Sequence, residues 1–293
     1  MLFASIDIGS NAVRLFFANV FELKGKPVVE KASLIRIPLR LGEDVFKTGK
    51  ISESKAANLM KTMFAFKLLM EVYKPVDYIA CATSAMREAE NNLEILEKIN
   101  KETGINIKII DGIEEAQILC AANNVIANKK FNISMYIDVG GGSTDISIVK
   151  DHLLIGSNSF NLGTIRLLNE KVSEDEWNKL KDWLKTYTKD FGKIQLIGSG
   201  GNINKLSKLY STQPDCSLSY HNLNHGYKCL CSLTLQQRIE EIGMRPDRAD
   251  VIIPAAEIFL TVMKTIKADF VFVPRIGLSD GLIYNVYRKY KKG

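Results

Sequence analysis

The sequence predicts an α/β protein made of two related domains. Strand-like and helix-like segments alternate along its 293 residues, and one short pattern occurs twice, at residues 5–11 and 136–143. Each copy is a strand that ends in Asp, any residue and Gly, followed by small polar residues, and the two aspartates, Asp7 and Asp138, are 131 residues apart. A domain usually has roughly one to two hundred residues, so this length suggests two domains. A duplicated unit of three strands followed by alternating helices and strands predicts two α/β domains with a cleft between them.

The elements of the first half follow from local patterns. Apolar or β-branched runs separated by turn residues predict three consecutive strands, at residues 2–6, 13–20 and 28–37. Apolar residues at helical spacing, with Ser52 at the head and Pro75 beyond the end, predict a helix over residues 52–73. The other elements expected here are strands at 78–82 and 105–110 and helices at 92–101 and 114–127.

The second half repeats this order. Three strands are expected around the second glycine loop, at residues 134–139, 146–150 and 153–160. Later elements are expected as strands at 194–197 and 270–273 and as helices at 174–188, 202–209, 233–242, 249–267 and 279–290. The polar break Asn128-Lys129-Lys130 places the boundary, which gives domains 1–127 and 128–293.

Composition excludes several classes of protein. A hydrophobic fraction of 46% excludes intrinsic disorder, and the most apolar stretch, residues 251–263, is interrupted by Pro254 and Glu257 and is too short to span a bilayer. No signal peptide and no membrane partner are expected. Five cysteines, an odd number, indicate reduced thiols and a cytoplasmic protein. The net charge of +6 is compatible with a polyanionic ligand, but no basic block predicts a nucleic-acid partner. A two-fold homodimer is expected on general frequency alone.

The two glycine loops are the candidate chemical sites. Glycine allows backbone N–H groups to turn toward a phosphate, and Ser or Asn adds side-chain donors. An Asp at the strand end can hold a divalent metal through water. Two such loops could bind one phosphate chain from both sides, although a glycine-rich hairpin can also be only a turn.

Other catalytic motifs are missing from the sequence. It has neither the Walker phosphate loop nor the dinucleotide glycine spacing, and three His without a metalloprotease or serine-hydrolase motif argue against hydrolysis by zinc or a Ser-His pair. Four metal-capable side chains lie between His221 and Cys231, but the two cysteines are closer than in usual zinc sites. We therefore expect an Asn-rich loop there rather than a zinc site.

Six motifs occur in an order and spacing that resemble a known family. They are Asp7-x-Gly9-Ser10-Asn11, Ala82-Thr83-x-x-x-Arg87, Gly112-x-Glu114-Glu115-Ala116, Asp138-x-Gly140-Gly141-Gly142-Ser143-Thr144, Gly198-x-Gly200-Gly201 and Arg275-x-x-x-Ser279-Asp280-Gly281. Together they resemble the exopolyphosphatase/guanosine pentaphosphate phosphohydrolase (Ppx/GppA) family of the actin-like ATPase superfold, in a short two-domain form. The resemblance implies duplicated actin-like (ribonuclease H-like) domains with a central interdomain cleft.

The resemblance also implies roles for individual residues. Glu115 matches the general base that orients a water molecule, whereas Glu114 points about 100° away around a helix and is expected to interact only with the helix dipole. Asp7, Asp138 and Asp145 match residues associated with Mg²⁺, although relatives usually have Glu where Asp145 stands. The residues that match phosphate contacts are Gly9, Ser10, Asn11, Arg87, Gly140, Gly141, Gly142, Ser143, Thr144, Gly198, Ser199 and Gly200. The alternative for Arg87 is an ion pair with Glu88 or Glu90.

The expected function is hydrolysis of a phosphoanhydride. The resemblance implies a Mg²⁺-dependent exopolyphosphatase that removes the terminal phosphate of inorganic polyphosphate. Three alternatives stay open: a guanosine pentaphosphate 5′-phosphohydrolase, an ATP-using kinase or ATPase of the same superfold, and a non-catalytic sensor of polyphosphate or guanosine tetraphosphate.

Overall fold

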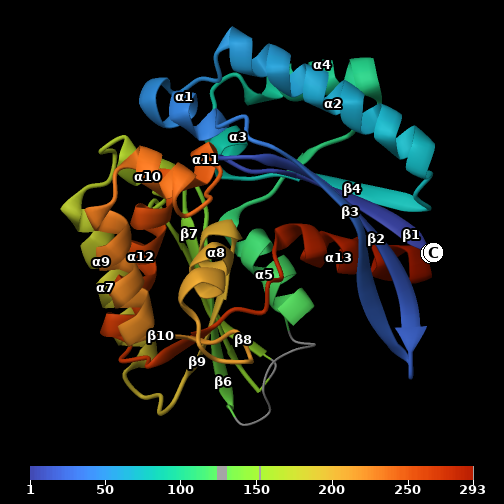
Figure 1. The fold of residues 1–293 in the computed structure, drawn as a ribbon. Helices are drawn as coiled ribbons and strands as arrows, with labels where there is room; N and C mark the ends of the chain where they lie inside the picture. Colours follow the sequence, from blue (N-terminus) through green and yellow to red (C-terminus); the bar gives the residue numbers. More distant parts are fainter. Residues whose placement is uncertain (124–130, 152, 293) are drawn as a thin grey trace. The chain divides into compact units, whose positions relative to one another are not determined.

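The computed structural model describes residues 1–123, 131–151 and 153–292 of the chain. These residues form two compact units, each with its own sheet (Figure 1). Unit 1 contains Met1–Ala122 together with Leu278–Gly293, and unit 2 contains Asn123–Gly277.

The sheet of unit 1 has five strands in the order β3-β2-β1-β4-β5. The strands are β1 (Leu2–Ile8), β2 (Val13–Leu23), β3 (Lys26–Ile37), β4 (Asp77–Ala82) and β5 (Lys108–Ile109). The first three form an antiparallel meander, and β4 and β5 run parallel to β1. The strand predicted at 105–110 is thus only two residues long.

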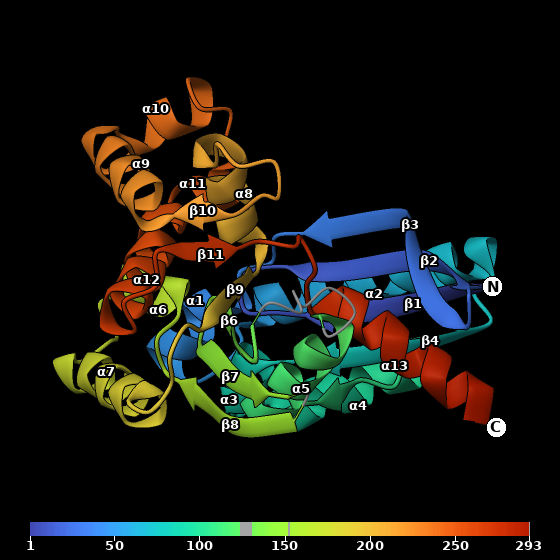
Figure 2. The ribbon, with the colours of Figure 1, turned by 90° about the horizontal axis from the view of Figure 1, so that it is seen from below.

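Helices cover both faces of this sheet. The helices of unit 1 are α1 (Leu41–Thr48), α2 (Glu53–Tyr73), α3 (Ser84–Glu88), α4 (Asn92–Thr103), α5 (Gly112–Asn123) and α13 (Leu278–Lys292). Figures 1 and 2 show α2 and α4 on one face and α5 and α13 on the other. The helix predicted at 114–127 is therefore present as far as Asn123, and its last four predicted positions lie outside the described residues.

The last helix corrects the predicted domain division, which placed it in the second domain at 128–293. Ile283, Val286 and Tyr287 of α13 pack in one buried cluster with the apolar face of β1 and β2. The hydroxyl of Ser5 in β1 donates a hydrogen bond of 2.9 Å to the carbonyl of Ser279. The end of the chain therefore completes the core of unit 1.

The sheet of unit 2 repeats that of unit 1 with one added strand. Its order is β10-β11-β9-β6-β7-β8. The strands are β6 (Ile133–Val139), β7 (Thr144–Lys150), β8 (Leu153–Phe160), β9 (Gln195–Ser199), β10 (Leu218–Ser219) and β11 (Phe270–Phe272). As in unit 1, the first three strands are antiparallel and the next two run parallel to the first, while β10 pairs antiparallel with β11. The predicted duplicated α/β architecture is confirmed.

The helices of unit 2 pack around a single large apolar core. They are α6 (Thr164–Leu168), α7 (Glu174–Thr188), α8 (Gly201–Tyr210), α9 (Tyr220–Ser232), α10 (Leu235–Glu240), α11 (Pro246–Ala249) and α12 (Ile252–Thr265). The segment around His221 to Cys231, predicted as a loop, is helix α9. Ser219 caps it by accepting a 3.1 Å hydrogen bond from the amide of Asn222, and Leu223, Gly226 and Leu230 form its buried face.

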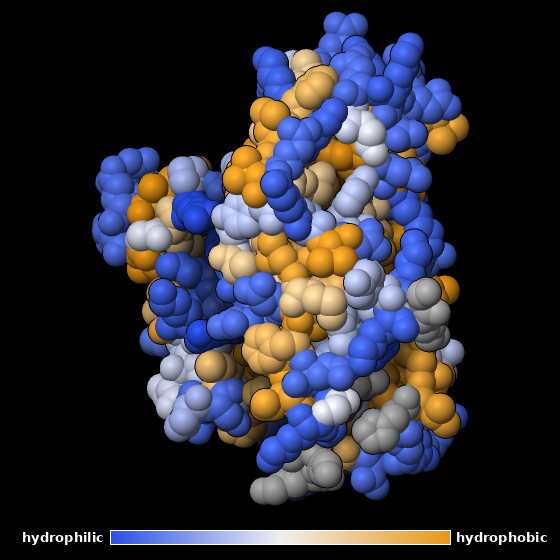
Figure 3. Space-filling model, turned by 90° about the vertical axis from the view of Figure 1, so that its right-hand side faces the viewer, coloured by the Kyte–Doolittle hydropathy of each residue, from blue (hydrophilic) through white to orange (hydrophobic). Residues whose placement is uncertain are grey.

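Among the described residues, no helix is both long and apolar enough to cross a membrane. Figure 3 shows hydrophobic residues interspersed with hydrophilic ones on the face that it draws.

Candidate functional site

The register of the two sheets places the duplicated motifs at equivalent positions. In unit 1, Asp7 lies opposite Arg14 of β2 and beside Cys81 of β4. In unit 2, Asp138 lies opposite Asp145 of β7 and beside Ser199 of β9. The turns also match, because Gly9 donates its N–H to the Ala12 carbonyl at 3.1 Å and Gly140 donates to the Ser143 carbonyl at 2.9 Å. The two hairpins therefore have the same strand register at the aspartate and the same hydrogen bond across the turn.

The glycine loop of unit 2 has its carbonyl groups held on one side by α6. The carbonyls of Gly140, Gly141 and Gly142 accept hydrogen bonds from Thr164 N (3.0 Å), Ile165 N (2.8 Å) and Arg166 Nε (2.6 Å), respectively. In a trans peptide the C=O and the N–H point in opposite directions. The three following N–H groups, at positions 141–143, therefore point away from α6. Successive N–H groups aimed the same way form an anion-binding concavity.

Gly163 allows this arrangement because it lies directly against the loop. A Cβ on Gly163 would stand 2.3 Å from the Gly141 carbonyl oxygen. Both are backbone atoms, so the loop and α6 would have to separate. We expect Gly163→Ala to lower the free energy of unfolding by about 1–3 kcal/mol, the usual cost of overpacking, and to reduce phosphate release.

The measurement for Gly163→Ala is urea unfolding together with a phosphate-release assay. Gly192→Ala is the matched control, because a Cβ there meets no atom within 4 Å. Equal stability and activity for the two variants would show that the contact does not position the loop.

The glycine loop of unit 1 is held in the same way by the start of α1. The Ser10 carbonyl accepts from Gly42 N at 2.9 Å, and the Asn11 carbonyl accepts from Arg40 N at 3.0 Å. The Ser10 hydroxyl is buried, 2.8 Å from Ser84 Oγ, and accepts the amide of Ala85 at 3.2 Å. Ser10 was predicted to contact phosphate; its side chain instead joins the loop to α3, which leaves its backbone for a ligand.

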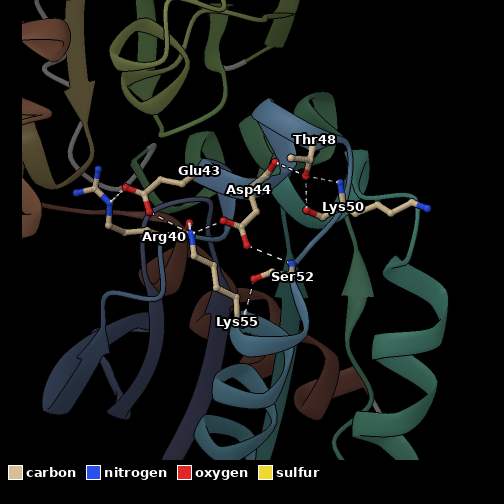
Figure 4. Close-up of polar contacts among 7 residues, drawn as sticks. All are labelled: Arg40, Glu43, Asp44, Thr48, Lys50, Ser52 and Lys55. Carbon is tan, nitrogen blue, oxygen red and sulfur yellow. Dashed lines mark hydrogen bonds and ion pairs between the residues drawn. The ribbon is translucent and has the colours of Figure 1, made fainter.

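A charged network fixes the start of α1 (Figure 4). Arg40, in the left-handed conformation with φ of 52°, pairs through Nε with Glu43 at 2.6 Å. Lys55 Nζ donates to the Arg40 carbonyl at 2.6 Å and lies 3.1 Å from Glu43 and 3.0 Å from Asp44. Burial raises the pKa of Asp44, but hydrogen bonds from Ser52 and Lys55 outweigh it and the pKa is lowered. The network therefore holds the backbone donors of α1 against the loop.

The two hairpins differ in charge at one equivalent position. In unit 1, Arg14 Nη1 lies 2.5 Å from Asp7 Oδ2 in an ion pair, and the Asp7 side chain is almost fully buried. In unit 2, the position of Arg14 is taken by Asp145, directly opposite Asp138 on the same face of the sheet. Carboxylates directly opposite each other on a sheet repel. The predicted metal residues are thus of two kinds: an aspartate paired with arginine and an aspartate pair.

The aspartate pair fits the ligands that Mg²⁺ takes near phosphates, where one or two carboxylates combine with water and substrate oxygens. Ser143 Oγ donates to Asp145 Oδ2 at 3.0 Å and orients that carboxylate. Among the residues that the structure describes, no group of three or more His, Cys, Asp or Glu is placed to hold a metal on its own. An ion here would therefore depend on substrate and water for its other ligands.

The end of β9 packs against Asp138 of the aspartate pair. Gly200, with φ of +102°, is the N-cap residue before α8, and a Cβ on it would lie 2.9 Å from Asp138 Oδ1. Gly198 is needed for packing, because its Cβ would meet Phe259 and Val271 at 3.0 Å. Ser199 is buried, and its hydroxyl is 3.4 Å from the Ile137 carbonyl. Of the three predicted phosphate contacts at this turn, Ser199 lies beside Asp138 in the sheet and Gly200 packs against the Asp138 carboxylate. Thr144 is also engaged internally, through the Leu162 carbonyl.

The start of α5 separates the two neighbouring glutamates. Asp111 Oδ1 accepts the amide of Glu114 at 2.8 Å, and Glu114 pairs at the surface with Lys108 at 2.5 Å. Glu115 is buried, with 7% of its surface exposed. The two glutamates therefore have different environments, one at the surface beside Lys108 and the other buried. Arg87 Nη1 donates to the Ile110 carbonyl at 2.9 Å, which positions the guanidinium beside the segment that leads to α5.

The pKa of Cys81 in β4 is raised by burial and by nearby carboxylates. Burial, together with the nearby carboxylates of Glu114 and Asp7, raises its pKa to about 12. At pH 8 such a thiol has on the order of a thousand-fold less thiolate than an ordinary cysteine. We expect iodoacetamide to leave Cys81 unmodified in the folded protein and to label exposed Cys231, as measured by peptide mass spectrometry. Labelling of Cys81 at the rate of Cys231 before urea is added would contradict this assignment.

A basic cavity of about 360 Å³ was not predicted from the sequence. It lies beside α8, and its lining includes Lys205, Lys208, Arg245, Arg248 and Arg275. Burial, together with repulsion from Lys208 and Arg248, lowers the pKa of Lys205. Cations gathered at the cost of mutual repulsion are typical of sites for anions. The sequence signal that could have indicated this cavity is the three-residue spacing of two pairs of cations, Lys205 with Lys208 and Arg245 with Arg248.

The comparisons with known proteins agree on one family. A sequence model of the Ppx/GppA phosphatase family matches residues 33–290. The chain is 26% identical to exopolyphosphatase 1 of Mycobacterium leprae, over 95% of this chain and 87% of that protein. It is 22% identical to the guanosine-5′-triphosphate,3′-diphosphate pyrophosphatase of Aliivibrio fischeri, over 97% of this chain and 59% of that protein. Among solved structures, an exopolyphosphatase from Cytophaga hutchinsonii superposes with a TM-score of 0.85 at 23% identity, covering 99% of this chain and 98% of that one.

Proposed function

The chain belongs to the Ppx/GppA phosphatase family and is a phosphoanhydride hydrolase, and we propose that it releases the terminal phosphate of inorganic polyphosphate in a Mg²⁺-dependent reaction. The observation that carries this proposal is the pairing of an anion-binding loop with two carboxylates in one hairpin. The N–H groups at 141–143 point away from α6, and Asp138 and Asp145 lie opposite each other on the two strands that the loop joins. Such a hairpin supplies donors for phosphate oxygens and ligands for a divalent ion.

Phosphoryl transfer needs little covalent chemistry from a protein, so positioning and charge neutralisation provide most of the catalysis. Asp138 and Asp145 would hold Mg²⁺, which when bound neutralises charge on the phosphate oxygens. The N–H groups of the loop orient the phosphate. In unit 1, the planar guanidinium of Arg87 suits a multi-oxygen anion. Asn11 lies in the glycine loop of unit 1, the counterpart of the loop of unit 2. Glu115 orients and deprotonates the attacking water.

The basic cavity of unit 2 favours polyphosphate over a guanosine nucleotide. Its described lining contains five cations and no aromatic side chain on which a base could stack. A phosphate chain carries charge along its whole length, whereas a nucleotide requires a surface for its base. The guanosine pentaphosphate reaction stays the second candidate, supported by the resemblance to the Aliivibrio fischeri enzyme. We place the protein in the cytoplasm, because Cys81, Cys216, Cys229 and Cys231, the cysteines whose side chains the structure describes, are free thiols.

The test of substrate class is phosphate release from polyphosphate, guanosine pentaphosphate and ATP under one set of conditions. Polyphosphate is expected to give the highest kcat/KM, and EDTA is expected to stop its hydrolysis. A higher kcat/KM with guanosine pentaphosphate would make the nucleotide the substrate. Saturable ATP hydrolysis alone would indicate an ATPase, and binding of polyphosphate without turnover of any of the three would indicate a sensor.

A further inference from the structure

A second, larger cavity lies in unit 2 at the opposite end of the sheet from the aspartate pair. It has a volume of about 1200 Å³ and lies where β9 and β11 begin, next to Gln195 and Phe270. Asp138 is near the far end of β6, which runs parallel to β9, and Ser199 ends β9 itself. The volume is enough for a small organic ligand, since known ligand sites are roughly 300–1,000 Å³. Nothing in the proposed phosphatase chemistry uses this cavity.

Aromatic side chains provide the apolar part of the wall. Phe191 and Phe272 are half-buried, and Phe270 is 49% exposed although it belongs to a strand of the sheet. Ile194 and Leu196 continue this surface. Exposed aromatic rings in a concave site can bury the apolar body of a ligand.

Lysines give the cavity a positive charge. Lys185, Lys189, Lys193 and Lys267 line it and are exposed, against the acids Asp215 and Asp269. Lys185 pairs with Asp182 at 3.4 Å. Asp215 accepts the amide and the hydroxyl of Ser217, at 3.0 and 2.7 Å, and these bonds lower its pKa. Within the described part of the chain, Lys189, Lys193 and Lys267 form no ion pair.

Two helix ends limit how much negative charge the cavity can accept. Helix α7 ends at Thr188 and α12 at Thr265, and both residues line the wall. The carbonyl groups at a helix C-terminus carry partial negative charge, which Lys189 and Lys267 partly offset. Lys193 belongs to neither helix, so its positive charge is not offset by the carbonyl groups of a helix end and can interact fully with a ligand. A single anionic group is therefore favoured over a chain of phosphates.

We infer that this cavity is a binding site for a small amphipathic anion. One carboxylate, sulfonate or phosphate monoester group is held by Lys193 with Lys189 and Lys267, and the apolar body lies against Phe191, Phe270 and Phe272. The inference is independent of the proposed function, since it involves neither of the glycine loops.

The probe is 8-anilinonaphthalene-1-sulfonate, an aromatic ring system with one sulfonate, titrated by fluorescence without Mg²⁺ or polyphosphate. We expect one molecule bound per chain. Lys193→Glu and Phe270→Ser are each expected to raise the dissociation constant of the probe by about tenfold or more. A tenfold rise is a loss of about 1.4 kcal/mol of binding free energy. Lys264→Glu is the matched control, because Lys264 is an exposed lysine of α12 outside the cavity lining, and its affinity is expected within about twofold of wild type.

Both substituted side chains are substantially exposed, and circular dichroism and phosphate release check that each variant is folded. Equal affinity of the wild type, Lys193→Glu and Phe270→Ser would overturn the inference. Displacement of the probe by an equimolar amount of inorganic tripolyphosphate would also overturn it, because the site would then select polyanions. If the wild type shows no phosphatase activity, the proposed function fails but this binding result still stands, because the probe is titrated without Mg²⁺ or polyphosphate.

Discussion

Glu115→Gln is expected to lower kcat for phosphate release from polyphosphate by roughly 10²–10⁴-fold, the range that general acid–base catalysis contributes. The amide keeps the size and hydrogen-bonding capacity of the side chain but cannot accept a proton from water. Binding of polyphosphate is expected to change by less than about threefold, since the loops and cations that hold phosphate are untouched. Steady-state kinetics with polyphosphate measures the first effect, and equilibrium binding measures the second.

Glu114→Gln is the matched control for this variant. The same change is made one residue away, on a side chain that pairs at the surface with Lys108. An exposed ion pair contributes at most about 1 kcal/mol to stability, so near wild-type turnover is expected. If Glu115→Gln and Glu114→Gln retain equal activity, Glu115 is not the general base.

Asp145→Asn is expected to raise the Mg²⁺ concentration for half-maximal activity by at least about tenfold and to lower the maximal rate. The substitution removes one of two facing carboxylates and leaves Asp138 as the remaining charged ligand. Hard divalent cations bind more weakly as ligand charge is removed. The measurement is phosphate release as a function of Mg²⁺ concentration, and Asp138→Asn is expected to behave in the same way.

Asp7→Asn tests whether the two copies of the hairpin have diverged. Asp7 is paired with Arg14 rather than with a second carboxylate, so its substitution breaks an ion pair. We expect lower stability in urea but an unchanged Mg²⁺ concentration for half-maximal activity. An equal shift in Mg²⁺ requirement for Asp7→Asn and Asp145→Asn would contradict the assignment of the metal to unit 2.

The sequence was sufficient to predict the duplication and both hairpins. The pattern Asp-x-Gly at the end of an apolar strand is local, and its two copies, around Asp7 and Asp138, have the same register in the structure. The prediction placed helix α13 in the wrong half because its packing partners, such as Phe3, lie in the first half of the chain, far from it in sequence. Helix α9 was missed because polar and sulfur-containing residues hide the helical spacing of Leu223, Gly226 and Leu230.

The charged groups around the site were harder to predict than its glycines. Arg14 lies seven residues after Asp7, and only the antiparallel pairing of β1 with β2 brings the two together. The basic cavity combines residues from α8, from α11 and the loop before it, and from the segment after β11. No single stretch of sequence contains this cluster, so composition showed only a mild excess of positive charge.

The most direct test of the central claim is ion chromatography of the products that the wild-type protein forms from long-chain polyphosphate, with saturating Mg²⁺ and with EDTA. Orthophosphate is expected to be released from the earliest times while the remaining chains shorten gradually, and EDTA is expected to abolish the release. Equal rates of release in Mg²⁺ and in EDTA, or the early appearance of mid-length fragments from internal cleavage, would contradict the claim.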